Sequence, residues 1–425
     1  MQCEMAVAGV SGGPYGKKIM PETRVKEAER ASLLFWFEKK KMSFFQNNHN
    51  MGHGRDTCFQ TKLWTSRELS LPNLYYYCVG ISLFFTIFAV KIKTLMDILI
   101  TGASGFIGSF IVEEALRRGM NVWAAMRKTS SRKYLTDSRI NFIELDLSSQ
   151  TRLVEQMTGL CFDVVVHAAG ATKCLHKEDF FKVNTDGTRN LVRALQQLQM
   201  PLKRFVYVSS LSVYGPVREQ RPYSEIKESD MPRPNTAYGQ SKLDSERFLD
   251  TLEDFPCVTL RPTGVYGPRE CDYFMMAKSI KGHTDFSVGY KPQDLTFVYV
   301  LDVVQAVFLA IERGKSGRKY FLSDGKVYSS RTFSDLIHRE LGRPWLLRIK
   351  APIWVLRVVT FFGEYVGRIT GKVSALNNDK YNIMRQRNWR CDIAPAREEL
   401  GYTPQYDLER GVPLTVKWYC DNGWL

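Results

Sequence analysis

Short apolar runs alternate with longer amphipathic stretches from residue 97 onward. Runs rich in branched and aromatic residues are typical of buried strands, and we expect six of them, at 97–100, 121–126, 140–145, 163–167, 204–209 and 258–261. Apolar residues at helical spacing follow the first strand, over 109–118, and precede the fifth, over 179–197. Repeated strand–helix units predict an α/β fold with a parallel, doubly wound sheet, in which ligands bind at the carboxyl ends of the strands.

A glycine-rich turn joins the first strand to the first helix. Its glycines have the spacing G-x-x-G-x-x-G, within Thr101-Gly102-Ala103-Ser104-Gly105-Phe106-Ile107-Gly108. Glycines between a strand and a helix permit a tight turn, close approach of the backbone to a pyrophosphate, and packing of the helix on the strand. The helix N-terminus also offers free N–H groups to phosphates. We therefore expect a dinucleotide to be held here by Gly102, Ser104, Gly105, Phe106, Ile107 and Gly108.

Two residues with acid–base chemistry stand four apart on a predicted helix. Tyr238 and Lys242 therefore leave the same helix face. An ammonium beside a phenol favours the phenolate, so this pairing predicts a lowered pKa for Tyr238 and a role as general acid or base. Ser210, at the end of the fifth strand, can hydrogen-bond the reacting oxygen and stabilise its developing charge.

These motifs occur together with four others, His167-Ala168-Ala169-Gly170, 183–188, 209–215 and 261–268. Their identity and order resemble the extended short-chain dehydrogenase/reductases, the NAD-dependent epimerase/dehydratase family. The resemblance covers 96–425. It implies a Rossmann-like, NAD(P)-binding domain over 96–262 and a smaller C-terminal α/β region over 263–425 that binds the substrate and returns some elements to the first domain. It also implies that catalysis belongs to Ser210, Tyr238 and Lys242.

The same resemblance implies further cofactor contacts. These come from Asp146 and Leu147 after the third strand, from His167, Ala168 and Ala169 after the fourth, and from Tyr238 and Lys242 themselves. We expect His167 to be a core residue whose backbone lines the cofactor. For Asn184, a structural role and a catalytic role both remain open.

The end of the second strand bears on which dinucleotide binds. Relatives that prefer NAD carry an acidic residue there, which accepts hydrogen bonds from the ribose hydroxyls. This strand ends instead in Arg127 and Lys128, followed by Thr129. Two cations suit a 2′-phosphate, so we expect NADP as the cofactor, with NAD as the alternative.

Substrate contacts are implied by the resemblance at Ser212, Thr263, Gly264 and Tyr266. Nucleotide-sugar enzymes of the family usually carry an asparagine where this chain has Thr263-Gly264. That departure favours an NAD(P)-dependent oxidoreductase that acts on a secondary alcohol or carbonyl of an apolar or steroid-like molecule. The alternative is a nucleotide-sugar epimerase or dehydratase. A non-catalytic dinucleotide-sensing scaffold is disfavoured because the three catalytic candidates are intact.

The broad apolar segment 352–371 has three interpretations. It could cap a hydrophobic pocket or rest on a bilayer surface, but we expect a helix that faces the core. A second apolar segment, 69–90, has no charged residue and is long enough to be a membrane anchor. Only a few residues would separate that anchor from the first strand. We therefore expect 1–95 to be an unstructured or apolar upstream extension, with Met96 as a candidate native start.

Composition narrows the partners and the compartment. Lys and Arg number 59 against 44 for Asp and Glu, a net charge of +15, but from residue 96 on there is no long basic run, which argues against nucleic-acid binding. The nine cysteines include no C-x-x-C pair, so we expect no metal site and reduced thiols in a cytoplasmic protein. A small-molecule substrate is the expected partner, and a homodimer is possible by analogy with the family.

Overall fold

The computed structural model describes residues 96–370 and 377–425. The interpretations placed on 1–95, including the segment 69–90, lie outside the described residues. No helix within the described ranges has both the length and the apolar character needed to cross a bilayer.

Seven parallel strands form the central sheet in the order β10-β6-β5-β4-β1-β2-β3. The doubly wound parallel sheet expected from the sequence is confirmed, and each of the six expected strands is present to within about two residues. The strands are β1 Asp97–Thr101, β2 Asn121–Met126, β3 Asn141–Glu144, β4 Val164–His167, β5 Arg204–Val208, β6 Cys257–Pro262 and β10 Lys319–Leu322.

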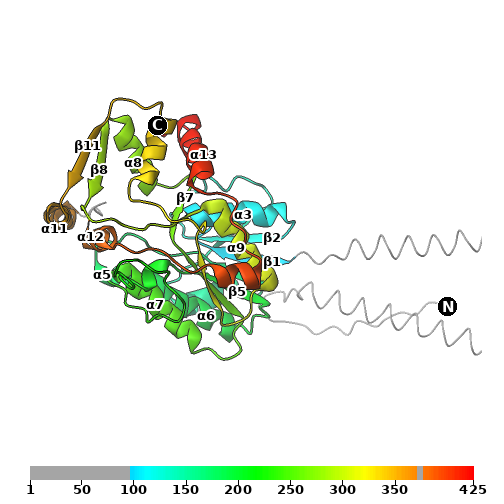
Figure 1. Ribbon diagram of the computed structural model, residues 1–425. Coiled ribbons are helices and arrows are strands. Elements are labelled where there is room, and N and C mark those ends of the chain that lie inside the picture. The colour runs from blue at the N-terminus through cyan, green and yellow to red at the C-terminus, as the bar shows by residue number, and fades with distance from the viewer. Residues whose placement is uncertain (1–95, 371–376) are drawn as a thin grey trace, which may run out of the picture. The chain divides into compact units, whose positions relative to one another are not determined.

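Helices cover both faces of this sheet. One face carries α3 (Phe106–Arg117) and α9 (Val300–Arg313), and the other carries α4 (Gln150–Met157), α6 (Gly187–Gln197) and α7 (Ala237–Asp250) (Figure 1). Because side chains alternate along a strand, Ile98 and Ile100 enter the core under the first helix layer while Leu99 enters the core under the second. All three are fully buried, which explains why β1 is an unbroken apolar run.

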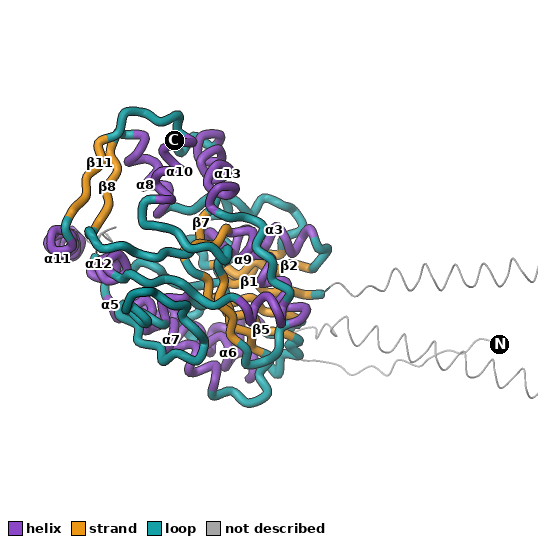
Figure 2. The backbone as a smooth tube through the Cα atoms, viewed as in Figure 1, coloured by secondary structure: helices purple, strands orange, loops and turns teal. Residues whose placement is uncertain are grey.

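The smaller region is built around two short strand pairs (Figure 2). β7 (Gly264–Tyr266) pairs with β9 (Phe297–Tyr299), and β8 (Thr284–Val288) pairs with β11 (Leu347–Ala351), both in parallel. Helices accompany these strands: α8 Asp272–Lys281, α10 Thr332–Glu340, α11 Ile353–Thr370, α12 Asn378–Arg385 and α13 Leu408–Asp421. Although β10 and α9 follow β7 in the chain, both belong to the central sheet and its helix layers.

The helix expected over 179–197 is interrupted. A short α5 (Lys177–Phe180) leads into a π-helical turn, Phe181–Asp186, before α6 begins. Asn184 lies in this turn, and its backbone oxygen accepts hydrogen bonds from the hydroxyls of Thr188 and Ser245. π-turns often occur at functional sites, and this one places the Asn184 side chain among the candidate catalytic residues.

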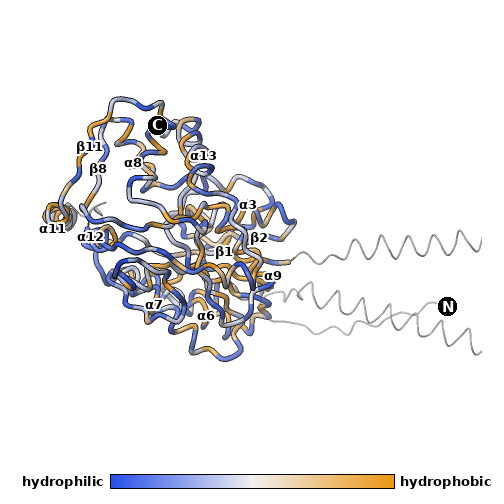
Figure 3. The backbone as a smooth tube through the Cα atoms, in the orientation of Figure 1, coloured by the Kyte–Doolittle hydropathy of each residue, from blue (hydrophilic) through white to orange (hydrophobic). Residues whose placement is uncertain are grey.

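The expectation that 352–371 forms a core-facing helix is wrong. The helix is present as α11, but its large apolar side chains are mostly exposed; they include Trp354, Phe361, Phe362, Tyr365 and Ile369. Figure 3 shows this helix as an apolar element at the margin of the smaller region. Apolar periodicity identifies the helix and its apolar face, but it does not determine what that face packs against.

Candidate active site

The glycine turn forms a cradle that larger residues would fill. Gly102 has φ +70, and a Cβ there would lie 2.7 Å from the Ala169 nitrogen at the end of β4. A Cβ on Gly108 would lie 2.1 Å from the Gly102 oxygen. Among the described residues, no side chain caps the N-terminus of α3, where Gly105 is the N-cap. The free N–H groups and the close backbone approach fit a dinucleotide pyrophosphate.

His167 is anchored in the core beside this turn. Its Nδ1 lies 2.7 Å from the Thr101 hydroxyl and its Nε2 lies 2.9 Å from the Thr188 hydroxyl. Burial lowers the pKa of His167 to about 3, so the ring is neutral. Thr188 already donates to the Asn184 oxygen, which leaves Nε2 of His167 as the donor in their hydrogen bond. The side chain is thus structural, as expected.

The candidate catalytic helix α7 begins at a capped turn. The Thr236 hydroxyl accepts a hydrogen bond from the Gly239 N–H at 2.9 Å, a standard N-cap. Tyr238 is in the first turn of α7, and Lys242 follows one turn later, as the spacing predicts. The Lys242 Nζ donates to the Val208 oxygen at the end of β5 at 3.0 Å. The helix and the sheet end are therefore joined at the candidate catalytic residues.

The predicted lowering of the Tyr238 pKa is wrong. Burial raises the pKa of Tyr238 to about 12, and a hydrogen bond with Ser210 opposes that rise only in part. Burial also lowers the pKa of Lys242 to about 8, and its ammonium lies over the Tyr207 ring, 4.8 Å from the centroid. Tyr238 is therefore a neutral phenol at pH 7, which is the form that can donate a proton.

Asn184 connects three parts of the site. Its side-chain oxygen accepts the Ala171 N–H at 2.7 Å, and its amide donates to the Ser241 hydroxyl at 2.9 Å. Gly170 fits beside it because a Cβ there would lie 3.1 Å from the Lys242 Nζ and 3.2 Å from the Asn184 oxygen. These contacts show the structural role that the sequence left open, since Asn184 fixes the loop after β4 against α7.

A cavity of about 310 Å³ opens at the end of β5 and β6. Ser210, Ser212, Thr263 and Gly264 line one part of it. The rest is mainly apolar and aromatic, with contributions from α8, β8, β9, α10 and α12; these side chains include Met276, Phe286, Val288, Leu295, Phe297, Phe333, Ile383, Met384 and Trp389. Elements of the smaller region thus supply most of the wall opposite Ser210.

Tyr266 is the one expected substrate residue that the structure places elsewhere. Its ring is fully buried and packs edge-on against Phe297 and Phe333, and its hydroxyl donates to the Asp407 oxygen at 2.9 Å. The side chain thus belongs to the core of the smaller region and does not line the cavity. A tyrosine on a short strand alternates between two faces, and the sequence did not show which one is covered.

The residues expected to contact the cofactor after β3 are held by the protein, whereas those after β2 are exposed. The Asp146 carboxylate accepts hydrogen bonds from the Ser148 hydroxyl at 2.6 Å and from Arg152 at 2.7 Å, and the Ser148 bonds hold the pKa of Asp146 below its usual value. Leu147 packs on Gly187, and its backbone oxygen accepts from Asn190. By contrast, Arg127 and Lys128 extend from the end of β2 as exposed side chains.

Asp379 is a residue of the site that sequence reasoning missed. It lies in the first turn of α12, and its two carboxylate oxygens accept the N–H groups of Ala237 and Tyr238, each at 3.2 Å. Asn382 of the same helix donates to the Asn235 oxygen at 2.9 Å. A carboxylate at a helix N-terminus is stabilising. No local motif signals this contact, because 141 residues separate Asp379 from Tyr238.

We expect Asp379→Ala to destabilise the fold by about 1 kcal/mol and to lower kcat several-fold, because the first turn of α7 carries Tyr238. Asp379→Asn keeps one acceptor and should restore most of the kcat. Steady-state kinetics and thermal unfolding of both variants separate the two effects. A loss of stability with a wild-type kcat would show that Asp379 is only a helix cap and does not position Tyr238.

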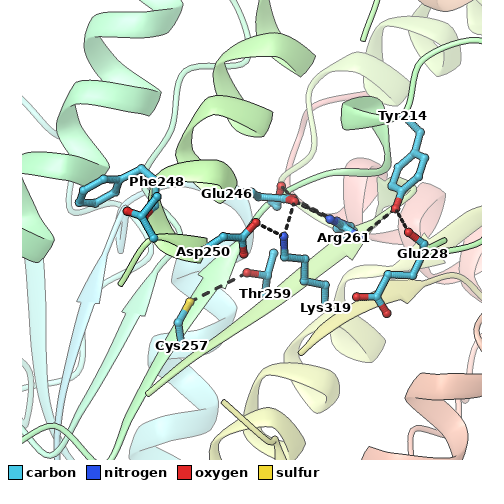
Figure 4. Close-up of polar contacts among 11 residues, drawn as sticks. Tyr214, Glu228, Glu246, Phe248, Asp250, Cys257, Thr259, Arg261 and Lys319 are labelled. Atoms are coloured by element: carbon cyan, nitrogen blue, oxygen red, sulfur yellow. Dashed lines mark hydrogen bonds and ion pairs between the residues drawn. The ribbon is translucent and has the colours of Figure 1, made fainter. Parts of the chain in front are cut away.

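A buried ion pair joins Glu246 of α7 to Arg261 of β6 (Figure 4). The Glu246 side chain is 0% exposed and that of Arg261 is 4% exposed, and their closest approach is 2.5 Å. The Ser209 hydroxyl donates to the same carboxylate at 2.5 Å, so Ser209 faces the core while its neighbour Ser210 lines the cavity. Lys319 on β10 lies 3.8 Å from Glu246 and 2.6 Å from Asp250. This cluster fixes the strand end that presents Ser210.

Comparison with known proteins finds relatives that align with about three quarters of this chain. The sterol-4-alpha-carboxylate 3-dehydrogenase (decarboxylating) of Candida albicans is 27% identical over 359 residues, which cover 78% of this chain and 99% of the relative. UDP-glucose 4-epimerase of Vibrio cholerae is 25% identical over 338 residues, which cover 76% and 96%. The two relatives differ in the chemistry that their names describe.

A solved structure shares the fold of this chain, and a family model matches its sequence. DesIV, a dTDP-glucose 4,6-dehydratase from Streptomyces venezuelae, has a TM-score of 0.64 at 23% identity, covering 77% of this chain and 98% of its own, and this likeness shows a shared fold. The model of the NAD dependent epimerase/dehydratase family matches residues 98–323, more than half of the chain and all of the residues from Gly102 to Lys242 discussed above. The chain therefore belongs to the NAD dependent epimerase/dehydratase family.

Proposed function

We propose that this protein is an NAD(P)-dependent oxidoreductase that interconverts a secondary alcohol and a carbonyl on a largely apolar molecule. The observation that carries the proposal is the lining of the cavity. Within the described residues, Asp285 is the one charged side chain that lines it, and Asp285 is paired with Arg331 at 2.8 Å. The diphosphate of a nucleotide sugar is normally bound by cationic side chains. The apolar wall of this cavity instead suits a ring system or a hydrocarbon.

The candidate residues supply the remaining chemistry of a reduction. Ser210 and Tyr238 would donate hydrogen bonds to the substrate oxygen, which stabilises the charge that develops on it. Tyr238, a neutral phenol at pH 7, would give its proton to that oxygen, and oxidation of the alcohol would reverse this transfer. When bound at the glycine turn, the dinucleotide supplies the hydride in reduction and accepts it in oxidation.

The assay for this function measures net oxidation of NADPH or NADH with apolar ketones, including steroid ketones, and net reduction of the oxidised cofactor with the matching alcohols. We expect stoichiometric change in the cofactor. Nucleotide-sugar epimerisation or dehydration leaves the cofactor unchanged overall, so turnover of UDP-glucose or dTDP-glucose without net cofactor change would overturn the proposal in favour of the alternative. Similarity to the Vibrio cholerae epimerase makes that comparison necessary.

We propose NADP as the preferred cofactor, on the basis of Arg127 and Lys128. Their exposed cations follow β2, where a 2′-phosphate would be expected. Arg127→Ala/Lys128→Ala should raise the Kd for NADPH about 10- to 100-fold, since two charge-assisted contacts are lost, and should change the Kd for NADH much less. Fluorescence titration measures both constants. Equal weakening for the two cofactors, or a wild-type protein without preference, would contradict this assignment.

A further inference from the structure

α11 carries an apolar stripe that faces away from the protein. Trp354, Val358, Phe361, Tyr365 and Ile369 follow one another at intervals of four, three, four and four residues, so they share one helix face. They are 67, 45, 67, 60 and 68% exposed, respectively. We call these five residues the α11 stripe. Phe362, which is 59% exposed, lies beside it.

The opposite face of α11 makes the contacts with the protein. Leu356 and Thr360 are buried, at 6 and 2% exposure, and stand about half a turn from the centre of the stripe. A helix stabilised by its own core normally buries its apolar stripe and exposes its polar face. In α11 the broader apolar face is exposed instead, and contiguous exposed apolar surface of this kind marks an interaction site.

The neighbouring strand extends the apolar surface and adds positive charge. In β11, Leu347 and Ile349 alternate with Arg348 and Lys350, and all four are exposed. Arg348 is paired with Asp335 of α10 at 2.7 Å, so Lys350 is the cation of β11 that remains available to a partner. Residues 343–370 contain five basic residues and one acidic residue. Arg357, one of the five, is exposed on α11 itself. An aromatic, apolar helix with surrounding cations has the composition of an element that lies in the interface of a membrane with anionic lipids.

The start of α11 is adjacent to the wall of the cavity. Ile353, at the start of α11, packs on Gly289, which directly follows β8, and Phe286 and Val288 of β8 line the cavity. α12 follows α11 in the chain and contributes Ile383 and Met384 to the same cavity. The surface and the cavity are thus built on the same elements of the smaller region.

We propose that the α11 stripe, with the cations of β11 and α11, binds the surface of an anionic lipid bilayer. A second copy of the chain fits this surface less well, because isologous pairing would bring two identical cationic surfaces together. A bilayer offers both an apolar interior for the aromatic side chains and anionic headgroups for Lys350 and Arg357. This inference concerns a different surface from the candidate active site and does not depend on the proposed reaction.

The test is cosedimentation of the full-length protein with vesicles of equal parts phosphatidylglycerol and phosphatidylcholine, and with vesicles of phosphatidylcholine alone. We expect binding to the anionic vesicles that weakens as salt rises. Phe361→Ser/Phe362→Ser should reduce the partition coefficient at least ~10-fold, since two aromatic side chains lose their apolar burial. Met231→Ser/Leu414→Ser is the matched control, because it removes exposed apolar side chains outside α11 and β11.

Thermal unfolding and NADPH binding establish that each variant is folded. If the wild-type protein cosediments with neither type of vesicle, the proposal is overturned. Equal binding by the wild-type protein and Phe361→Ser/Phe362→Ser would also overturn it, because another part of the chain would then hold the lipid. Sedimentation velocity without lipid tests whether a second copy of the chain binds the α11 stripe. A wild-type dimer that Phe361→Ser/Phe362→Ser dissociates would assign the stripe to that second copy and would refute the lipid proposal.

Discussion

Replacement of Tyr238 by phenylalanine is expected to reduce turnover by about 10²- to 10⁴-fold, the usual contribution of a positioned general acid or base. The variant removes only the phenol oxygen. The helix cap at Thr236 and the Lys242 contact with Val208 do not involve that oxygen. Cofactor affinity should therefore stay close to that of the wild type. Single-turnover kinetics with the identified substrate measure the chemical step, and NADPH titration measures binding.

Tyr266→Phe is the matched control for this experiment. It removes a tyrosine hydroxyl that donates to the Asp407 oxygen in the core of the smaller region. We expect it to lower stability by about 1 kcal/mol with little change in kcat. An active Tyr238→Phe enzyme would assign the acid–base role to another group. A large loss of kcat in Tyr266→Phe at retained stability would restore that residue to the substrate site.

Arg261→Leu is expected to lower the free energy of unfolding by about 3–5 kcal/mol, because it leaves the buried Glu246 carboxylate without its main partner. Three Arg261–Glu246 hydrogen bonds would be lost, together with the bond from Arg261 to the Tyr214 hydroxyl (Figure 4). Lys319, at 3.8 Å from Glu246, is too distant to replace them. Urea unfolding followed by tryptophan fluorescence measures the change.

Arg339→Leu provides the comparison. Arg339 pairs with Glu409 and Glu340, but its side chain is 39% exposed, so its removal should cost less than about 1 kcal/mol. The double variant Arg261→Leu/Glu246→Leu should be more stable than Arg261→Leu, because no isolated charge is then buried. If Arg261→Leu unfolds at the same urea concentration as Arg339→Leu, the buried pair is not a major constraint on the end of β5.

The elements that could be predicted from the sequence are those with a local signal. Apolar runs identified β1 through β6 because strands of a doubly covered parallel sheet are buried on both faces. The glycine spacing identified the turn, since a Cβ on Gly102 or Gly108 would meet backbone atoms. The four-residue spacing of Tyr238 and Lys242 placed both on one side of α7.

The parts that could not be predicted depend on contacts distant in sequence. Asp379 accepts the Tyr238 N–H from a distant part of the chain, and no local sequence motif at either residue predicts this contact. Periodicity found α11 but not what covers it. The pKa of Tyr238 follows from burial, which the pairing with Lys242 did not reveal. In each case the missing information was the packing environment of a correctly identified residue or element.

The position of β10 in the chain has a consequence for protein synthesis. A ribosome finishes β6 at Pro262, but the strand that pairs with β6 is not made until Lys319–Leu322. Until then the nascent chain has an unpaired sheet edge, and Glu246 and Asp250 lack the cation of Lys319. The central sheet is therefore completed only after much of the following region has been translated, although six of its seven strands are made first.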